Sequence, residues 1–549
     1  MTKFKSIIKK TTFKRVLVST VVFMVLLVGA ERVLDHLFPF PEHLFDRYGE
    51  SRRIYDSQNR LLRLSITMDG ERLIKIPLTE VSEHMINAII AGEDGNFFGH
   101  SGVDPYAVIR ACVTSAQRRK VISGASTITM QVARMVEPRP RTLKWKMVEM
   151  FRARQLERKF SKEQILEKYI NLVPLGGTLR GVEAASQRWF GKSASDLTSL
   201  EAAMFVAMLP APSRRSPNKT TNELLVWRNE ILRRMCVKGY IDDTTYLRFC
   251  QEPLHAKFRQ WDFLAPHYVD WKLKTQTGKS LSEQLELPRQ KMVEELLQQR
   301  PNKPVDGEAV VVLSRHTGAV LAMAGSDNYR EKPFNAALAH RTAGSTLKPF
   351  LYALALEEGV MGIEGKVSDH PGTFGEYCPT NFSDDFLGNV RASEALSSSR
   401  NLPAVRLLKS LGVEKFSHVL MSLGFDLPQT NLGLDLSLGT LSVSPLELAK
   451  AYQKFFDIKT NEMSWASREA ILKALSQRSP DQEQLPVESI AWKTGTSSGR
   501  RDAWCVGVSQ DHVVVVWLGN LDGRGDAELV GSHLAREVLV SVFAKMINS

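Results

Sequence analysis

The sequence predicts a multidomain protein with an N-terminal membrane helix, a mainly α-helical domain and an α+β domain in which helices pack on an antiparallel sheet. Three observations support this class. The 549 residues exceed the length of one ordinary domain. Apolar residues recur at helical spacing from Val81 to about Leu209, and from about Val305 short β-branched runs separated by turns replace that pattern. We place the boundaries at 1–40 for a cytoplasmic stub and anchor, 41–221 for the helical domain, 222–304 for a helical connector and 305–549 for the α+β domain.

The N-terminus has the pattern of a membrane anchor. Six Lys and Arg residues between positions 3 and 15 precede an apolar run from Val16 to Ala30, after which Glu31 restores charge. Because basic flanks stay on the cytoplasmic side, we expect a cytoplasmic N-terminus and exported domains. The run is shorter than the about 20 residues of a full span. Either a signal peptide cleaved near Ala30 or a retained single-pass anchor extended through Leu37 fits, and we favour the anchor.

The segments that follow the anchor divide by their periodicity. Residues 52–76 are predicted to be strand-rich, and helical segments at 222–249 and 280–299 form the connector. In the last domain a hairpin is expected at 309–324, and antiparallel strands are expected after Trp492. The helices of this domain lie between these two groups of strands.

The net charge and the cysteine content indicate which kinds of binding partner to expect. The formal net charge of +12 favours anionic ones, such as a lipid surface or a pyrophosphate. Nucleic acid is not expected, because the chain has no zinc-finger, basic-zipper or RNA-binding signature. Its five cysteines are scattered and include no Cys-x-x-Cys pair, which disfavours structural zinc. Pairing of Cys236 with Cys250 stays open.

Three short motifs in the last domain predict serine acyl transfer. Ser345-Thr346-Leu347-Lys348 places a hydroxyl and an amine on one helical face, where an unprotonated lysine accepts the hydroxyl proton. Ser399-Arg400-Asn401 and Lys493-Thr494-Gly495 follow in that order. In serine acyltransferases with this set, the second motif relays protons and the third forms a strand edge that binds a carboxylate.

A second chemical centre is predicted at the end of the first amphipathic helix. Glu93 follows Ile86 and Ile89 on an apolar stripe, where burial would raise its pKa and suit it to accept a proton. A helix-end carboxylate bonded to nearby backbone fits the stretch equally well. Asp94 and His100, which follow, also fit simple turn residues.

Two further segments offer groups for an anionic substrate. Small and hydroxyl-bearing residues from Ser126 to Gln131 open a helix that continues to Arg134, and helix N-termini and guanidinium groups bind phosphate. Lys146 and Glu149 stand three residues apart, a spacing that ordinarily indicates a solvated ion pair. Taken alone, each segment fits a structural helix.

Taken together, these segments and Lys162–Asn171 resemble, in order, the motifs of the family 51 peptidoglycan glycosyltransferases. The three acyl-transfer motifs resemble those of the penicillin-binding transpeptidases. A chain with both sets behind one anchor is similar to the class A penicillin-binding proteins, and the resemblance covers nearly everything after the anchor. It implies a lysozyme-like frame for the helical domain and a penicillin-binding fold for the last one.

The resemblance also implies roles for residues. Glu93 would be the base and Glu149 its assistant in polymerising lipid II into β-1,4 glycan. Ser345 would be the nucleophile, Lys348 its base and Ser399 a proton relay in D-Ala-D-Ala transpeptidation. The residues expected to bind substrate are Asp94, His100, Ser126, Thr129, Gln131, Arg134, Lys146, Tyr169, Asn171, Asn401, Lys493, Thr494, Gly495 and Thr496.

The expected partners follow from this resemblance. They are lipid II, nascent peptidoglycan, β-lactams and the inner membrane, with cell-wall synthesis proteins as candidates. No cofactor is required, although the resemblance leaves room for Mg²⁺ or Mn²⁺ in the glycosyltransferase site.

Three alternatives stay open at this stage. The last domain could bind stem peptides with little or no turnover. The helical domain could cleave glycan, because two carboxylates on a lysozyme-like frame also suit a hydrolase. A serine β-lactamase is the third, but it leaves the first two hundred or so residues unexplained.

Overall fold

The chain folds into two compact units. The structure is a computed structural model that describes residues 29, 31–118, 125–218, 221–253, 256–300, 305–428, 432–457, 463–476 and 490–547. The first unit comprises residues 1–52 and 64–261, and the second comprises residues 53–63 and 262–549. The predicted connector of 222–304 is divided between them, because its first helices pack on the helical core and its last one packs on the sheet of the second unit.

The predicted anchor core lies outside the described residues, apart from Gly29. Within the described ranges, no helix is long and apolar enough to cross a membrane. Residues 31–37 are helical, and Leu37 is 61% exposed. Glu31 and Asp35 pair with Arg154 and Arg158 at 2.9 and 2.6 Å, which fastens this helix to the helical unit.

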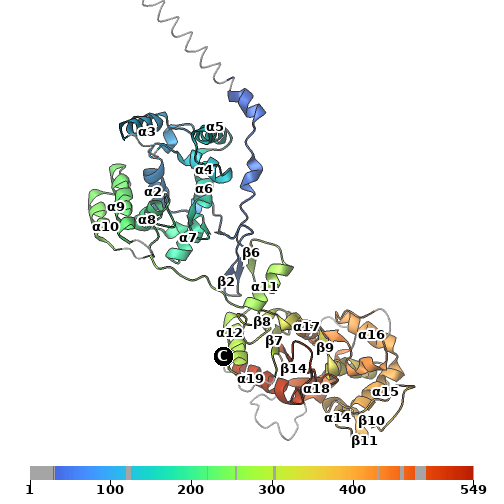
Figure 1. Cartoon of the computed structure of the whole chain (residues 1–549). Coiled ribbons are helices and arrows are strands. Elements are labelled where there is room, and N and C mark those ends of the chain that lie inside the picture. The colour runs from blue at the N-terminus through green and yellow to red at the C-terminus, as the bar shows by residue number, and fades with distance from the viewer. Residues whose placement is uncertain are drawn as a thin grey trace, which may run out of the picture. The chain divides into compact units, whose positions relative to one another are not determined.

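The first unit is mainly helical, as predicted (Figure 1). Its apolar stripes meet in one core that includes Ile89, Ile128, Ile170 and Phe205, all completely buried. Side-chain caps fix where several helices begin; Thr127, for example, accepts a hydrogen bond from Met130 N. The helices are α2 (Glu83–Glu93), α3 (Pro105–Arg118), α4 (Ile128–Val136), α5 (Leu143–Lys159), α6 (Lys162–Leu172), α7 (Val182–Trp189), α8 (Ser199–Met208), α9 (Thr221–Val237) and α10 (Asp243–Gln251).

Short strands fill the predicted strand-rich stretch. In the first unit β3 (Arg72–Leu73) pairs in parallel with β5 (Leu179–Arg180), which also pairs with β4 (Pro174–Gly176). The other small sheet has the order β2-β1-β6. Its strands are β2 (Leu61–Leu64), β1 (Arg53–Tyr55) and β6 (Ser280–Ser282).

A five-stranded antiparallel sheet organises the second unit, which confirms its predicted α+β class. The strand order is β13-β14-β15-β7-β8, so the hairpin predicted at 309–324 joins the late strands through β7. The strands are β13 (Ala491–Thr496), β14 (Asp502–Val508), β15 (His512–Gly519), β7 (Gly307–Ser314) and β8 (Val320–Ala324). β13 lies at one edge of this sheet.

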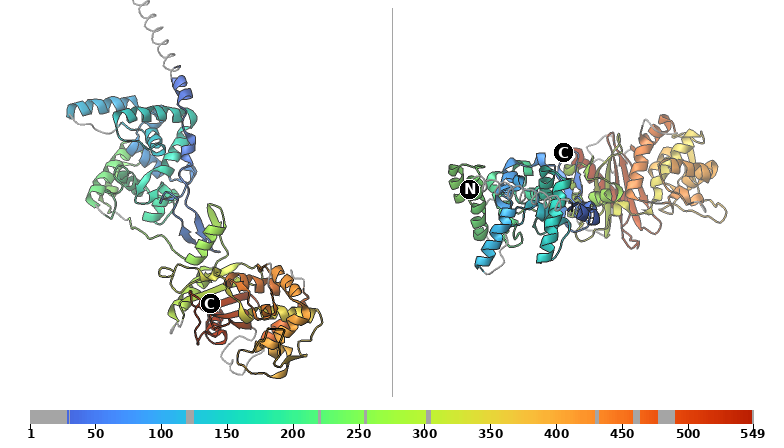
Figure 2. Two further views of the ribbon diagram at one scale, coloured as in Figure 1. Left: turned by 45° about the vertical axis from the view of Figure 1, so that its right-hand side comes forward. Right: turned by 90° about the horizontal axis from the view of Figure 1, so that it is seen from above.

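Helices cover both faces of the sheet, because alternate side chains of each strand enter two different cores. On β15, Val515 packs on one side with α13 (Lys348–Glu357) and α17 (Pro445–Phe456), and Val516 packs on the other with α12 (Leu287–Gln299) and α19 (Arg536–Ile547). Both views of Figure 2 show the orange helices around residues 392–422 gathered together beside the sheet. The other elements of the unit are α11 (Pro266–Thr275), β9 (Arg341–Thr342), β10 (Lys366–Asp369), β11 (Gly388–Arg391), α14 (Ala392–Ser397), α15 (Asn401–Leu411), α16 (Val413–Ser422), β12 (Ser442–Val443) and α18 (Trp465–Ser476).

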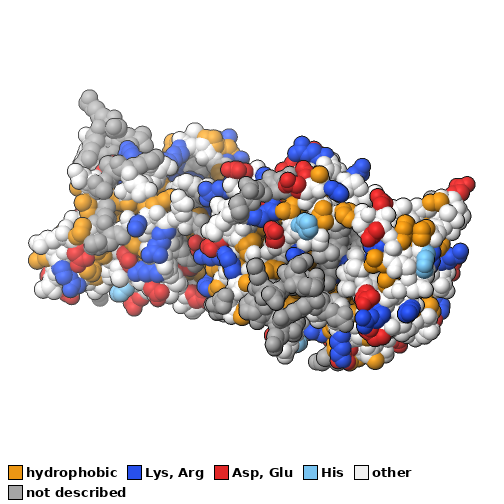
Figure 3. Space-filling model, turned by 90° about the horizontal axis from the view of Figure 1, so that it is seen from below, with side chains coloured by type: hydrophobic (Ala, Val, Ile, Leu, Met, Phe, Trp, Pro, Cys, Tyr) orange, Lys and Arg blue, Asp and Glu red, His pale blue; other side chains and the backbone are white. Residues whose placement is uncertain are grey.

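Surface charge is mixed on the face that Figure 3 shows. Blue Lys and Arg side chains are scattered there among red Asp and Glu side chains and apolar ones. The net charge of +12 is therefore not gathered into one field on this face. The described cysteines, Cys236, Cys250, Cys378 and Cys505, are free, so Cys236 and Cys250 are not paired.

Candidate active sites

Glu93 is the last residue of α2 and forms the centre of the first candidate site. Gln131 Nε2, from α4, donates a hydrogen bond to Glu93 Oε2 at 2.6 Å. Burial raises the pKa of Glu93, whereas the Gln131 bond and the charges of Arg234 and Arg134 lower it; the net direction is upward. The partner of this carboxylate is thus a side chain from another helix rather than nearby backbone.

Asp94 and His100 lie directly behind Glu93. His100 Nε2 contacts Asp94 Oδ2 at 3.0 Å, and Ile128 N donates to the same oxygen at 3.0 Å. Both side chains are almost completely buried. Asp94 therefore joins the end of α2 to the beginning of α4 and so holds Glu93 next to Gln131.

Lys146 connects the second set of predicted residues. Its Nζ donates to Ser126 Oγ at 2.5 Å and to Glu149 Oε1 at 2.8 Å. The Lys146 side chain remains 33% exposed and that of Glu149 is 11% exposed. The ordinary ion pair predicted from the spacing is present, and it joins the N-terminal side of α4 to α5.

Three predicted substrate contacts point into the protein instead. Thr129 and Tyr169 are completely buried, and Asn171 is nearly so. Thr129 Oγ1 donates to Glu157, and the Asn171 side chain bonds both the N–H and the C=O of Ile76. These three side chains face the core in this structure, and their expected contact with substrate stays a prediction.

Arg234 belongs to this site but was missed from the sequence. Its Nη1 donates to Gly92 O at 2.9 Å, and its charge acts on Glu93. It lies on α9, in the segment predicted as a connector, and no local motif marks it. Within the described parts of the chain, no cluster of three or more His, Cys, Asp or Glu side chains is arranged to hold a metal ion.

Ser345 is the central residue of the second candidate site. It lies in a 3₁₀ turn, Gly344–Leu347, that runs directly into α13. Ser345 opens onto a cleft of about 840 Å³, and Asn401 and Thr496 line the same cleft. The first two motifs thus contribute Ser345 and Asn401 to one cleft, and Thr496, directly after the third motif, lines it as well.

Lys348 is completely buried at the first position of α13. Its Nζ donates to Ser399 O at 2.7 Å, to Arg400 O at 3.1 Å and to Asn401 Oδ1 at 2.7 Å. Burial, with the charges of Lys493 and Arg400, holds the pKa of Lys348 well below its usual value. The predicted bond between Ser345 and Lys348 is not among the hydrogen bonds of the described residues; such bonds are often long in free enzymes and shorten with substrate.

Lys493 faces Ser399 from the edge strand β13. Its Nζ donates to Ser399 Oγ at 2.7 Å and to Thr494 O at 2.8 Å. Burial lowers the pKa of Lys493 to about 7. Thr496, on the same strand, accepts a hydrogen bond from Gly531 N through its Oγ1. Among the described strands, none pairs with the outer side of β13, and such an edge is where an extended peptide can add to a sheet.

Gly495 allows β13 to approach the Ser345 turn. A Cβ at this position would lie 2.8 Å from Thr346 Cγ2 and 2.9 Å from Ala343 O. The second atom is backbone and cannot be moved without shifting the turn that carries Ser345. A glycine is therefore needed here, which gives the third motif a steric reason beside its chemical one.

Replacing Gly495 by Ala is expected to slow β-lactam acylation at least about tenfold and to lower the free energy of unfolding by about 1–3 kcal/mol, as overpacking does. Acylation kinetics and urea unfolding measure the two effects. Gly362→Ala is the matched control, because its nearest heavy atom would be 3.9 Å away. Equal rates and stabilities for the two variants would refute this steric account.

Comparisons with known proteins agree with these two sites. A transglycosylase family model matches residues 60–236, and a penicillin-binding protein transpeptidase model matches residues 308–539. Penicillin-binding protein 1C of Escherichia coli (strain K12) is 34% identical over 517 residues, which cover 89% of this chain and 67% of that protein. The chain belongs to the class A penicillin-binding proteins. The predicted family is therefore confirmed.

Other class A relatives extend the match. Penicillin-binding protein 1A of Aquifex aeolicus is 28% identical over 604 residues, covering 86% of this chain and 82% of the relative. The crystal structure of penicillin-binding protein 1A from Haemophilus influenzae matches 91% of this chain and 92% of its own with a TM-score of 0.60. At 18% identity, that likeness shows the shared fold. The chain is a bifunctional peptidoglycan synthase, with glycosyltransferase and D-Ala-D-Ala transpeptidase activities.

Proposed function

We propose that Glu93 is the base of lipid II polymerisation. It would take the proton from the 4-hydroxyl of the acceptor sugar, whose oxygen then attacks the anomeric carbon of the donor chain. The bond to undecaprenyl pyrophosphate breaks and a β-1,4 linkage forms. The supporting observation is a partly buried carboxylate with a raised pKa, held by Gln131 beside the charges of Arg134 and Arg234.

The leaving pyrophosphate needs positive charge, and Lys146 and Arg134 supply it in this proposal. Ser126 Oγ and the N-terminal side of α4 lie beside Lys146 and add hydrogen-bonding groups. Glu149 keeps Lys146 in place through their 2.8 Å contact. A single carboxylate that is already paired with an ammonium is a weak site for Mg²⁺ or Mn²⁺, so no step is assigned to a cation.

The products separate this proposal from glycan cleavage. Purified protein is incubated with labelled lipid II or with preformed, uncrosslinked glycan. Polymer from lipid II and unchanged glycan support the transferase. Shortened glycan without any polymer would favour the hydrolase instead.

The polymerisation rate is expected to fall as the pH drops, with a midpoint above 4.5, because only the deprotonated Glu93 accepts a proton and its pKa is raised. Gln131→Leu removes a donor to the charged form and should move the midpoint higher. Initial rates with lipid II between about pH 3.5 and pH 9 measure both profiles. A midpoint at or below 4.5, or identical midpoints, would contradict this role. The raised pKa of Glu93 also links folding to pH. It adds to the free energy of unfolding at low pH, and this contribution is lost as the pH rises through the pKa of the folded state.

For the second site, we propose that Ser345 Oγ attacks the penultimate D-Ala carbonyl of a stem peptide. Lys348 takes the hydroxyl proton, and the N–H groups of Ser345 and Thr496 stabilise the oxyanion. Ser399 passes a proton to the departing D-Ala amine, which leaves an acyl-enzyme. The amine of a neighbouring stem peptide then attacks that ester and releases Ser345.

Two observations carry this proposal: Ser399 accepts bonds from both Lys348 and Lys493, and Ser345 and Asn401 line the same cleft. The lowered pKa of Lys348 supports its role as a base, because a neutral amine has the lone pair that the proton requires. Lys493 and Thr494 would bind the terminal carboxylate, and Asn401 would position the peptide. β-Lactams would acylate Ser345 by the same route.

A binding-only transpeptidase domain is the second candidate. It is favoured by the contacts of Lys348, all three of which are oxygens of the Ser-x-Asn segment rather than Ser345 Oγ. Mass spectrometry after incubation with penicillin distinguishes the two. An adduct on Ser345 supports turnover chemistry, and no adduct under conditions that label a control enzyme supports binding alone.

We further propose a single-pass anchor in the inner membrane, with the N-terminus in the cytoplasm and both units in the periplasm. The basic residues before Val16 and the apolar run to Ala30 support it. Val33 and Leu37, which follow this run in the sequence, have exposed apolar side chains. Membrane fractionation of the full chain and of a chain lacking residues 1–30 tests this placement.

A further inference from the structure

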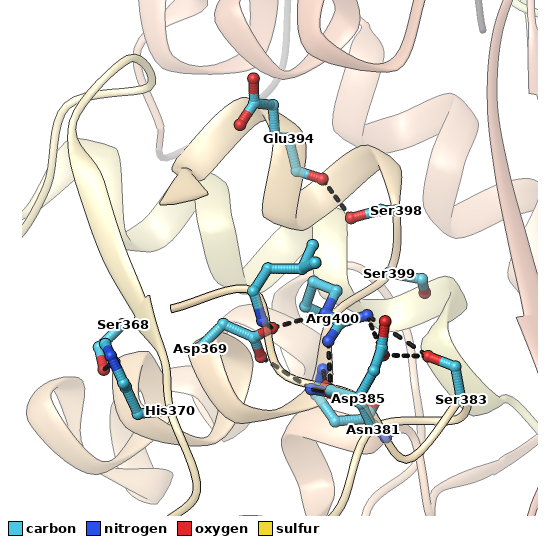
Figure 4. A network of polar contacts seen from close by, with 12 residues as sticks. Ser368, Asp369, His370, Asn381, Ser383, Asp385, Glu394, Ser398, Ser399 and Arg400 are labelled. Atoms are coloured by element: carbon cyan, nitrogen blue, oxygen red, sulfur yellow. Dashed lines mark hydrogen bonds and ion pairs between the residues drawn. The ribbon is translucent and has the colours of Figure 1, made fainter. Parts of the chain in front are cut away.

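A buried ion pair lies next to the Ser345 site, and the mechanism above does not use it. Asp369, the last residue of β10, is completely buried and accepts a 2.7 Å hydrogen bond from Arg400 Nε. It also accepts bonds from Asn381 Nδ2 at 2.9 Å and Leu387 N at 3.0 Å. Figure 4 shows this carboxylate among its donors. Neither Asp369 nor Arg400 is among the residues that line the cleft.

The other end of Arg400 binds the loop between β10 and β11. Its Nη1 donates to Asp385 Oδ1 at 2.8 Å, and its Nη2 donates to Asp385 O at 2.6 Å (Figure 4). The guanidinium therefore joins β10 to this loop by bonds at both of its edges, a geometry that lysine does not reproduce.

Asn381 connects the same loop to the next residue of the motif. Its Oδ1 accepts a bond from Asn401 N at 2.7 Å, and Asn401 Nδ2 donates to Thr380 O at 2.8 Å. Thr380, Asn381 and Asn401 all line the cleft. The network thus holds the Ser-x-Asn segment together with Thr380 and Asn381, which form one lip of the cleft.

The segment held in this way has an uncommon backbone and carries the reacting groups. Ser399 has φ +62°, a left-handed conformation that a serine keeps only where its surroundings impose it. Its Oγ accepts the bond from Lys493, and its carbonyl accepts one from Lys348. The residues flanking Arg400 are therefore those that position both lysines.

We infer that Asp369 and Arg400 are positioning residues for acyl transfer. They hold Ser399 and Asn401 in the geometry that orients Lys348, and they attach one lip of the cleft to these two residues. The inference rests on the proposed function of Ser345 and deepens it. Asp369 and Arg400 touch no reacting atom and act through the backbone and side chains of their neighbours.

Because Asp369 and Arg400 are charged, their removal should change the pH dependence of acylation, which a purely structural role would not do. The charged groups facing Lys348 are Lys493 on β13, Arg400 at the start of α15 and Asp369 on β10. Arg400 lowers the pKa of Lys348, and Asp369 raises it. The acid limb of acylation should therefore move to lower pH in Asp369→Asn and to higher pH in Arg400→Met.

Stopped-flow acylation of the full chain by a fluorescent penicillin tests this inference. The acylation step is expected to slow by about 10- to 100-fold in Asp369→Asn and Arg400→Met, as for misplaced catalytic groups, with little change in the preceding binding constant. Arg400→Lys should recover part of the rate. Glu308→Gln is the matched control, because Glu308 is a carboxylate of the same unit, 2% exposed and paired with Arg300.

The outcomes separate this inference from the proposed function. No adduct on the unmodified chain would overturn both. The inference alone would be overturned if the unmodified chain forms a normal adduct but Asp369→Asn and Arg400→Met are acylated no more slowly than Glu308→Gln per folded molecule, with unshifted pH profiles. If Asp369→Asn does not fold, Asp385→Ala, which removes a 53% exposed carboxylate that accepts a bond from Arg400 Nη1, tests the attachment of the lip by the same assay. An unchanged rate in that variant would also count against the inference.

Discussion

Replacing Ser345 by Ala is expected to lower both transpeptidation and penicillin acylation by more than about 1,000-fold, because no other group can form the acyl bond. Lipid II polymerisation should persist, since Glu93 and its partners belong to the other unit. Intact-protein mass spectrometry with penicillin and muropeptide analysis measure the two activities.

Ser326→Ala is the matched control for this variant. Ser326 is a buried serine of the same unit that precedes an Asp-Asn pair. Its Oγ forms hydrogen bonds with His267 and with Lys332 O and does not line the cleft. It should retain acylation. Acylation of the Ser345→Ala protein at the normal rate, or equal losses in both variants, would remove Ser345 from its assigned role.

Glu93→Gln is expected to lower polymerisation by about 10²- to 10⁴-fold, the usual contribution of a general base. The substitution keeps the shape of the side chain and an oxygen that accepts the Gln131 bond, so the fold should be preserved. Penicillin acylation should be unchanged. Turnover of labelled lipid II, followed by gel separation of the glycan products, measures the effect.

Glu183→Gln serves as the control, since Glu183 is a buried carboxylate of the same unit that accepts its bond from Ala194 N. That variant should polymerise normally once its folded fraction is taken into account. Normal polymerisation by Glu93→Gln would require a different base.

Much of the acyl-transfer site was predictable, because its three motifs are short and each depends on neighbours in the sequence. The spacing from Ser345 to Lys348 indicated one helical face, and the structure has that turn. It did not indicate which oxygens Lys348 meets. These belong to Ser399, Arg400 and Asn401, more than fifty residues later in the chain.

The residues that were missed share a physical reason. Asp369, Asn381 and Arg234 act through contacts with other segments of the chain, so no local spacing marks them. The apolar spacing predicted between Val81 and about Leu209 matches the buried face of α6, where Tyr169 is completely buried. The substrate contact that the family motif implies for Tyr169 stays a prediction.

The domain boundaries were less predictable than the elements. Periodicity indicated helices where α9, α10 and α12 lie, but it missed α11 and was wrong for Ser280–Ser282, which form the strand β6. It also carries no information about which core a helix joins. Leu232 of α9 packs with the helical core, and Val293 of α12 packs with the sheet. The chain between them therefore crosses from one unit to the other within the predicted connector.

We propose that one chain polymerises lipid II through Glu93 and crosslinks the product through Ser345. The most direct test incubates the purified full chain with labelled lipid II, digests the product with muramidase and separates the muropeptides. We expect crosslinked dimers from the unmodified chain. Ser345→Ala, or the unmodified chain with penicillin present, should give monomers alone, and Glu93→Gln should leave lipid II unreacted. Crosslinked dimers from Ser345→Ala, or polymer from Glu93→Gln at the normal rate, would contradict it.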